Sequence, residues 1–481
     1  MRNSAAQPLI FVLTFGSFIA AIGTFFSVGL ENDLTEATFW GQELVTVTDK
    51  HPAGFGLVHY FWSIAFSYNE FLVKMLGVAN LLFCVWILWL VLKELGWSAE
   101  TRLFPIFLAL ASFNSYLFLI KYNGNSAPAP FWLLAMLLIL RLQKGPSILS
   151  WFALGIACAI AVFMKYHTAL FLLTIFGYAL SSSKTRTWFL TSGPYVAMAS
   201  FLIVVLPHAI EMFRYDFPGL SYGISNVTTT AADPLLGRLM HPAKFALIQF
   251  LFALPGLGVA LYWAQRKKVS FELGEEARRF LLWFGLIFPL SPCLVAIVTG
   301  GALGSIWGVG ASFLIIPYVL SRRKVGMKAI GAFRTGRRTL LITFSAFGFL
   351  FLVAQPFEVE AEPKRELASL VEAKLLEIQV APPRFVFSRS HSANALNFYM
   401  SAHPSIIRGA DWLSQPWTTA DREYLDPVLI QLTRPQTSEA VASELGVRIV
   451  EVFEIDIPPV IEGLSKHTGY NATFLYGYYD P

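Results

Sequence analysis

A series of long apolar runs constrains the fold of this chain more than any other feature of its sequence. A helix needs about 20 apolar residues to cross about 30 Å of hydrocarbon. Only 14% of the 481 residues are charged, whereas soluble domains carry about 25%. The sequence therefore predicts a polytopic α-helical membrane protein with about eleven transmembrane helices. The predicted spans are roughly 8–29, 71–92, 103–120, 127–143, 148–164, 167–182, 187–207, 243–264, 280–299, 302–320 and 339–355.

Basic residues predict the orientation of these spans. With the N-terminus in the cytoplasm, the loops on that side collect most of the Lys and Arg residues, including the stretch 322–338. Such an excess is typical of cytoplasmic loops. The net charge of +5 therefore reports topology and contact with lipid headgroups, and no nucleic-acid partner is expected. The loop at 30–70 then faces outward.

The composition changes after the last apolar run. Residues 356–481 begin with a charged helical stretch, and strand-like runs follow near 384–388 and at 447–453. Gly, Pro and Asp residues separate these runs, as in a small α/β domain. The sequence therefore predicts a transmembrane domain at 1–355 and a soluble domain at 356–481. An odd number of spans places the soluble domain outside, on the side of the loop at 30–70.

The first outer loop carries acidic and basic residues between two apolar runs. Asp33 and Glu36 are three residues apart, so a helix would place them on one face. Lys50 and His51 stand at the other end of the loop. A carboxylate can act as a general base on a hydroxyl, and a nearby cation can hold a phosphate. The loop therefore supplies both halves of a group transfer from a phosphate-linked donor, although spacing alone also fits a solvated loop with capping acids.

The loop pattern D-x-x-E-A…W-x-Q-E-L…D-K-H-P precedes three further polar segments at predicted outer ends. These segments are Y-N-G-N-S at 122–126, M-K-Y-H-T-A-L at 164–170, and P-H-A-I at 207–210 followed by Y-D-F-P-G-L. In this order, the four segments resemble polyprenyl-phosphate-dependent glycosyltransferases of the GT-C membrane fold. That family includes protein O-mannosyltransferases and the lipid A aminoarabinose transferase. The branch typified by lipopolysaccharide galacturonosyltransferases looks most similar.

The resemblance implies an inverting transfer of a sugar from a polyprenyl phosphate to an acceptor hydroxyl. Asp33 would be the general base, and Glu36 would support it or bind the sugar. Lys50 or His51 would neutralise the donor phosphate, which makes the lipid phosphate the leaving group. The family has a second proline after the basic residues, whereas this chain has Pro52 followed by alanine.

Residues of the later segments complete the predicted site. Lys165 and Arg214 are candidate phosphate contacts; the alternatives are interfacial snorkelling for Lys165 and pairing with Asp216 for Arg214. The residues expected to bind the sugar or acceptor are Asn123, Asn125, Tyr166 and His208. Relatives often have an acid in the second outer loop, where this chain has the two asparagines. An asparagine can orient a sugar hydroxyl but cannot act as a base.

The histidines show no metal-ligand spacing, so no metal or other cofactor is expected to be required, although a divalent metal stays open. A transporter or flippase of lipid-linked sugars is the main alternative function. Transporters often show internal repeats and ionisable residues at mid-span, whereas here the acids gather in the outer loop. A non-catalytic assembly subunit with the same fold is a third hypothesis.

Several properties of the reaction stay open at this point. The sugar is galacturonic acid, aminoarabinose, mannose or another hexose. Lipopolysaccharide core or lipid A is favoured over protein as the acceptor. The expected location is the bacterial inner membrane, with a cytoplasmic N-terminus and a periplasmic C-terminal domain.

Overall fold

The chain forms two compact units in a computed structural model. The structure describes residues 6–26, 29–42, 44, 47–48, 50–228, 234–266, 273–321, 329–354, 364–388, 393–408, 427–432, 447–457 and 470–479. We call Met1–Ala20, Lys50–Pro52 and Met75–Phe349 the helical unit. Ala21–Asp49, Ala53–Lys74 and Leu350–Pro481 form the mixed unit. The domain boundary near residue 355 stays a prediction, since these units group the first outer loop with the C-terminal segment.

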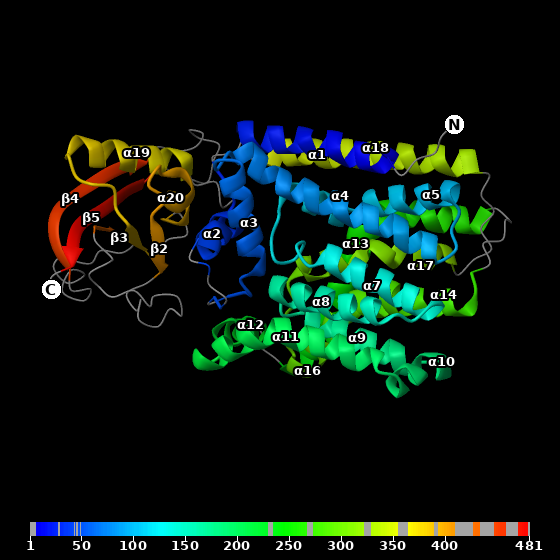
Figure 1. Ribbon diagram of the computed structural model, residues 1–481. Helices are drawn as coiled ribbons and strands as arrows, with labels where there is room; N and C mark the ends of the chain where they lie inside the picture. Colours follow the sequence, from blue (N-terminus) through cyan, green and yellow to red (C-terminus); the bar gives the residue numbers. More distant parts are fainter. Residues whose placement is uncertain are drawn as a thin grey trace. The chain divides into compact units, whose positions relative to one another are not determined.

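Each predicted apolar run is helical over most of its described residues (Figure 1). The helices that carry the runs are α1 (Ala6–Phe26), α4 (Glu70–Glu94), α5 (Ala99–Leu110), α6 (Phe113–Ile120), α7 (Ala129–Lys144), α8 (Ile148–Met164), α9 (Thr168–Leu180), α11 (Gly193–Arg214), α13 (Pro234–Arg266), α14 (Glu275–Leu282) with α15 (Phe288–Leu290) and α16 (Pro292–Thr299), α17 (Ile315–Ser321) and α18 (Ala329–Ala354). Shorter elements between them are α10 (Ser183–Arg186), α12 (Pro218–Thr228), the 3-10 helices η1 (Thr187–Leu190) and η3 (Ser305–Leu314), and the π-helix η2 (Trp283–Ile287).

The helices confirm a polytopic α-helical membrane protein. Within the described ranges, α1, α4, α11, α13 and α18 are each long and apolar enough to cross a membrane, and two bent helix pairs raise the number to seven. The count of eleven spans stays a prediction. One bent pair is α5 and α6, which meet at 71° within the predicted span 103–120. The break lies at Ser112, whose hydroxyl donates to the carbonyl of Ala109 at 2.7 Å and caps α6.

Serine residues set the beginning of several helices. In each case the hydroxyl accepts a hydrogen bond from the backbone N–H three residues further on, which satisfies one of the donors that a helix leaves unpaired at its start. The capping residues are Ser98 for α5, Ser112 for α6, Ser147 for α8 and Ser182 for α10. These caps therefore fix the residue at which each of the four helices begins.

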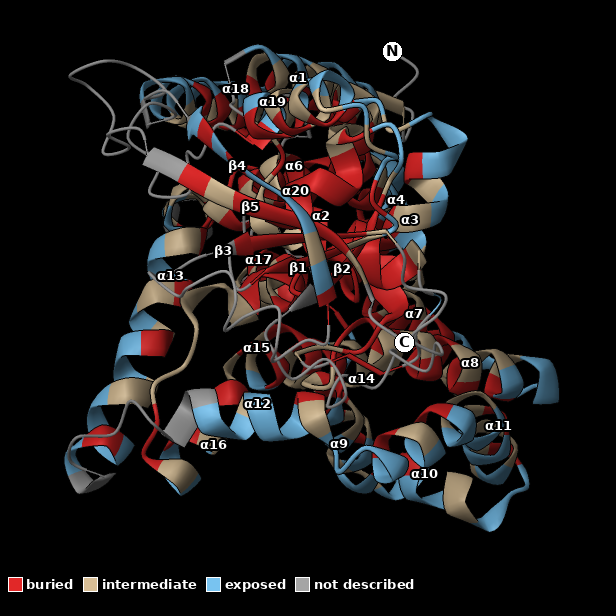
Figure 2. Cartoon of the chain, turned by 90° about the vertical axis from the view of Figure 1, so that its left-hand side faces the viewer, coloured by how far each residue is buried: buried red, intermediate tan, exposed pale blue. Residues whose placement is uncertain are grey.

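The outer surface of α11 is apolar. Its exposed side chains include Leu202, Ile203, Leu206, Ile210 and Phe213, and Figure 2 shows most of this helix as exposed or half-exposed. An apolar stripe of this size is unfavourable in water but not in lipid. The exposed face of α11 therefore fits contact with hydrocarbon.

A five-stranded sheet forms the C-terminal part of the mixed unit (Figures 1 and 2). Its strand order is β2 (Ser405–Arg408), β1 (Phe385–Ser388), β3 (Val428–Leu432), β5 (Tyr470–Tyr479) and β4 (Val447–Ile457). The strand β1 is parallel to β2 and β3, whereas β5 is antiparallel to β3 and β4. The helices α19 (Lys364–Glu377) and α20 (Ala393–Tyr399) precede or join these strands. The predicted small C-terminal sheet domain is thus present.

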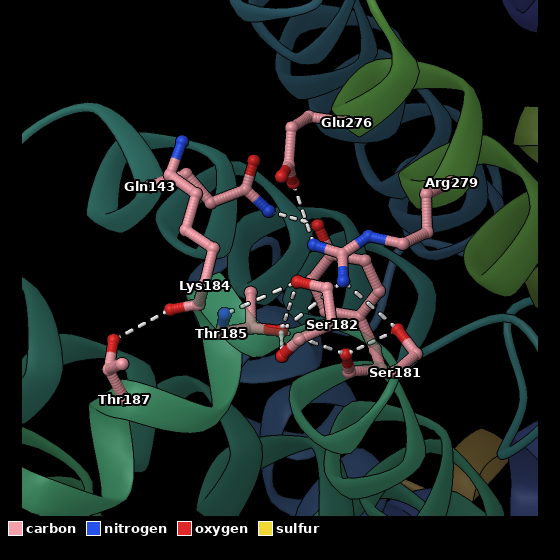
Figure 3. A network of polar contacts seen from close by, with 9 residues as sticks. Gln143, Ser181, Ser182, Lys184, Thr185, Thr187, Glu276 and Arg279 are labelled. Atoms are coloured by element: carbon pink, nitrogen blue, oxygen red, sulfur yellow. Dashed lines mark hydrogen bonds and ion pairs between the residues drawn. The ribbon is translucent and has the colours of Figure 1, made fainter.

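A partly buried cation joins three helices of the helical unit. Arg279 on α14 donates to the hydroxyls of Ser181 and Thr185 at 3.2 and 3.3 Å. It pairs with Glu276 at 2.7 Å and lies 4.8 Å from the centre of the Tyr178 ring. Figure 3 shows Arg279 directed toward the turn between α9 and α10. The network therefore satisfies a charge that would be costly to bury alone.

Two glycines of α13 provide a test of the helix packing. A methyl group at Gly256 would collide with the carbonyl oxygen of Leu108 on α5, whereas a methyl group at Gly258 meets nothing within 4 Å. We expect Gly256→Ala to cost about 1–3 kcal/mol through overpacking. Gly258→Ala, as the matched control, should leave stability unchanged or raise it by about 0.5–1 kcal/mol. Thermal unfolding in detergent micelles measures both, and equal midpoints for the two variants would contradict this packing.

Candidate active site

The helix α2 (Asn32–Gln42) carries both acidic residues of the predicted site. It begins where the backbone N–H of Leu34 donates to the carbonyl of Glu31 at 3.0 Å. Asp33 lies half-buried in the first turn, where the helix dipole favours a negative charge. Glu36 is 4% exposed. The segment is helical, so the condition under which the two carboxylates share one face, one turn apart, is met.

The helix α2 packs against α3 (Gly54–Ala65). The Trp40 ring meets the Phe55 ring edge to face, with 5.7 Å between centroids. The hydroxyl of Thr38 lies 3.0 Å from Nδ1 of His59, and both side chains are fully buried. These contacts form a core between the two helices. The orientation of α2, and with it that of the carboxylates, is therefore fixed relative to α3.

Basic side chains gather in the helical unit, which includes Lys50–Pro52. The half-buried His167 lies within reach of the charges of Lys165 and His51. The His51 ring meets the Tyr222 ring edge to face at 6.2 Å. Neither ring nitrogen of His167 has a hydrogen-bond partner among the residues that the structure describes. We call His51, Lys165 and His167 the basic cluster.

Lys165 points into the protein rather than toward solvent. It is 8% exposed, its ammonium donates to Oδ1 of Asn125, and it lies 5.7 Å from the centre of the Trp307 ring. The structure therefore brings together the two predicted residues Lys165 and Asn125. Asn123 shapes the loop instead, because its Oδ1 accepts from the backbone N–H groups of Asn125 and Ser126 at 2.9 and 3.3 Å, as in an Asx turn.

Two further predicted residues also meet. The hydroxyl of Tyr166 lies 3.2 Å from Nε2 of the buried His208. Burial raises the pKa of Tyr166, so its hydroxyl stays protonated and can donate a hydrogen bond at neutral pH. Arg214 pairs with Glu211 at 2.6 Å and its side chain is 66% exposed. This ion pair replaces the pairing with Asp216 that its sequence position suggested.

The predicted residues are thus divided between the two units. Asp33 and Glu36 belong to the mixed unit, whereas Lys50 and Lys165 belong to the helical unit. The pairing of carboxylates with phosphate-binding cations across the site stays a prediction. In the described ranges no group of three His, Cys, Asp or Glu residues could hold a metal ion, and the need for a metal also stays open.

Sequence reasoning missed His167. Its only signal was its place in the M-K-Y-H-T-A-L segment, next to two residues that were selected. The sequence does not show that both ring nitrogens of this half-buried imidazole are shielded from solvent beside two other basic groups. Its ring lies edge to face with Trp132 at 5.1 Å, so packing by an aromatic side chain from α7 holds it in place.

Comparisons with known proteins identify the fold. Residues 49–210 match the family model PMT_2, described as dolichyl-phosphate-mannose-protein mannosyltransferase. The structure matches ArnT from Cupriavidus metallidurans over 98% of both chains, in the apo state (TM-score 0.61, 13% identity) and in a crystal structure with undecaprenyl phosphate bound (TM-score 0.60, 12% identity). A search of curated protein sequences finds no match.

These matches confirm the resemblance to GT-C glycosyltransferases that the outer segments indicated. The chain is an integral membrane protein with a GT-C fold and a small C-terminal sheet domain. The matched family model covers residues 49–210, and at 12–13% identity the similarity to the ArnT structures shows the fold.

The buried His59 predicts a dependence of stability on pH. Burial lowers its pKa to about 3 from the ordinary value of 6.5, so between these values the unfolded chain binds a proton that the folded protein does not. The free energy of unfolding is therefore independent of His59 above pH 6.5. It decreases, by up to about 1.4 kcal/mol per pH unit, as the pH falls from 6.5 toward 3. We expect thermal midpoints to fall less on acidification in His59→Gln than in the wild type. The same slope in both proteins would contradict a neutral His59.

Proposed function

We propose that this protein is an inverting glycosyltransferase that moves a sugar from a polyprenyl-phosphate donor to an acceptor in the cell envelope. The observation that carries the proposal is the GT-C fold, shared over 98% of both chains with a protein that binds undecaprenyl phosphate. The match of residues 49–210 to the mannosyltransferase family model supports it independently, because it rests on sequence rather than on shape.

Asp33 is the proposed general base. Its carboxylate takes the proton of the acceptor hydroxyl while the acceptor oxygen attacks the anomeric carbon from the side opposite the phosphate. The new carbon–oxygen bond forms as the bond to the phosphate breaks, which inverts the configuration. The proton remains on Asp33 and the lipid phosphate leaves as an anion. Glu36, one helical turn away, supports Asp33 or holds a sugar hydroxyl.

The basic residues are the proposed site of the donor phosphate. Lys50 and His51 in the first outer loop, together with Lys165, would stabilise the charge that develops on the leaving phosphate. Burial of Lys165 strengthens this proposal, because a charge with little solvent around it acts more strongly on a bound anion. Arg214 is a weaker candidate, since it is exposed and paired with Glu211.

The remaining predicted residues are assigned to the sugar and the acceptor. The Tyr166–His208 pair offers a hydroxyl and an imidazole to sugar hydroxyls, and the amide group of Asn125 can do the same. Asn123 is assigned with them, although its side-chain oxygen already accepts hydrogen bonds from two backbone N–H groups of its own loop. The proposed acceptor is lipopolysaccharide, lipid A or another envelope glycan. The reaction would take place on the periplasmic face of the bacterial inner membrane, with the soluble C-terminal domain on that side.

Asp33→Asn tests the chemistry. Purified protein is given a panel of polyprenyl-phosphate sugars, namely galacturonic acid, aminoarabinose and mannose, with lipid A or lipopolysaccharide as acceptor. We expect transfer by the wild type from one donor and a loss of about 10²–10⁴ in rate for Asp33→Asn, because an amide cannot accept the proton. The measured quantity is the amount of radiolabelled sugar on the acceptor.

The control for this test is Glu377→Gln, which changes a carboxylate to an amide at an exposed surface pair on α19. It should transfer sugar at the wild-type rate. Full activity in Asp33→Asn would overturn the assignment of the base. Movement of the donor lipid between leaflets with no transfer to any acceptor would overturn the proposed enzyme in favour of a flippase.

Lys165→Gln tests the phosphate site. The loss of a buried cation should weaken binding of the polyprenyl phosphate at least about tenfold, which corresponds to about 1.4 kcal/mol. The matched control is Lys144→Gln, since Lys144 makes an exposed ion pair with Glu94. Binding is measured by fluorescence quenching with undecaprenyl phosphate in detergent. Equal affinities of the two variants would exclude Lys165 from the phosphate site.

A further inference from the structure

The beginning of α2 is held by side chains from the C-terminal part of the chain. Leu30, two residues before the helix, is fully buried. Its backbone N–H donates to the hydroxyl of Tyr399 at 2.6 Å, and its carbonyl accepts from the ammonium of Lys364 at 2.9 Å. Both backbone polar groups of Leu30 are therefore satisfied by residues of α19 and α20, more than 300 positions further along the chain.

The end of α2 is held in the same way. The side-chain amide of Gln42, the last residue of the helix, donates to the carbonyl of His403 at 2.9 Å. The amide of the buried Asn397 on α20 donates to Oε1 of Gln42. In addition, the His403 ring stacks on the Tyr68 ring at 3.9 Å. Both termini of α2 are thus hydrogen-bonded to the segment 393–403 or to α19.

A buried carboxylate connects these contacts to α4. Glu70 is 8% exposed and accepts hydrogen bonds from the Tyr399 hydroxyl at 2.8 Å and from Arg365 at 2.7 Å. Lys74 on the next turn of α4 lies 2.9 Å from it. Since Tyr399 both accepts from Leu30 and donates to Glu70, its hydroxyl is the common point of the network. We call this set of contacts the α2 clamp; it is defined by Leu30, Gln42, Glu70, Lys364, Arg365, Asn397, Tyr399 and His403.

We propose that the C-terminal domain positions the catalytic helix through the α2 clamp, and that Tyr399 is a positioning residue for Asp33. This inference rests on the proposed function, because Asp33 is the base of the proposed transfer. The clamp holds both ends of a helix of 11 residues, so it limits both its tilt and its movement along its axis. A shift of the base by about 1 Å can reduce the rate of a reaction by about 100-fold.

Tyr399→Phe removes the hydroxyl at the centre of the clamp and keeps the ring. We expect backbone amides of residues 30–42 to exchange hydrogen about tenfold faster, since local opening of α2 becomes easier. The exchange of the strands β3 and β5 should not change. In the transfer assay, kcat should fall about tenfold while KM for the donor stays within about twofold, because the residues assigned to the phosphate lie outside the clamp.

Tyr478→Phe is the matched control, since it makes the same chemical change at a half-buried tyrosine of β5 in the same unit. It should leave the exchange of α2 and kcat unchanged. If Tyr399→Phe leaves the exchange of residues 30–42 at the wild-type rate, the positioning proposal is wrong. It is equally wrong if exchange rises in β3 and β5 to the same extent, because the hydroxyl would then serve general stability.

Arg365 offers a second and milder variant, because its side chain is half-exposed. Arg365→Gln removes the charge that pairs with Glu70 and should accelerate exchange in α2, whereas Arg365→Lys should restore most of the protection. Hydrogen exchange of the backbone amides requires no sugar donor, so it can be measured whether or not the protein transfers sugar. If the wild type transfers no sugar, the proposed function fails while the exchange measurement still decides whether the clamp holds α2. The positioning proposal is overturned if Arg365→Lys and Arg365→Gln exchange alike at the wild-type rate.

Discussion

The structure depends first on the need of backbone amides and carbonyls for partners where water is absent. In hydrocarbon these groups are satisfied inside helices, so the apolar runs become helices and leave no backbone group for chemistry. The polar residues therefore concentrate where helices end. Lys165 is the C-terminal cap of α8, Asn125 stands in the turn before α7, and Asp33 lies in the first turn of α2. The candidate site is thus built from helix ends and loops, as the physics of a membrane protein requires.

The low dielectric constant of the hydrocarbon and of the protein interior requires that buried charges have partners. Arg279 contacts hydroxyls and Glu276, and Glu70 accepts hydrogen bonds from Arg365 and Tyr399 and pairs with Lys74. These networks hold elements together, and the charges within them are paired with opposite charges. Lys165 is largely buried, and its ammonium donates to the neutral amide of Asn125. A buried cation acts more strongly on a bound anion than an exposed one, which makes Lys165 a stronger candidate for the proposed phosphate site than the exposed and paired Arg214.

Local sequence patterns predicted much of this molecule. Apolar runs gave the positions of the helices, and Asp33 and Glu36 share a helix face, as their spacing requires once the segment is helical. Features that depend on three-dimensional packing could not be predicted from the sequence. The stretch 103–120 is apolar enough to be predicted as one span, yet the helix breaks at Ser112, because a hydroxyl can cap a helix even inside such a stretch. His167 carries no such local signal, since its place beside His51 and Lys165 arises only when distant segments pack together.

The ends of α2 are held by residues that are distant from it in the sequence, and this affects the proposed chemistry. Its residues determine that it is a helix, but residues far along the chain, such as Tyr399 and Asn397, determine where its ends lie. The proposed base is therefore placed by the packing of the mixed unit, whereas Lys165 is placed by the packing of the helical unit. Activation of the acceptor and binding of the donor phosphate then depend on separate sets of contacts. Changes in one set should alter kcat without altering donor affinity, and changes in the other should do the reverse, which is the kinetic pattern expected when acid–base chemistry and leaving-group binding are built independently.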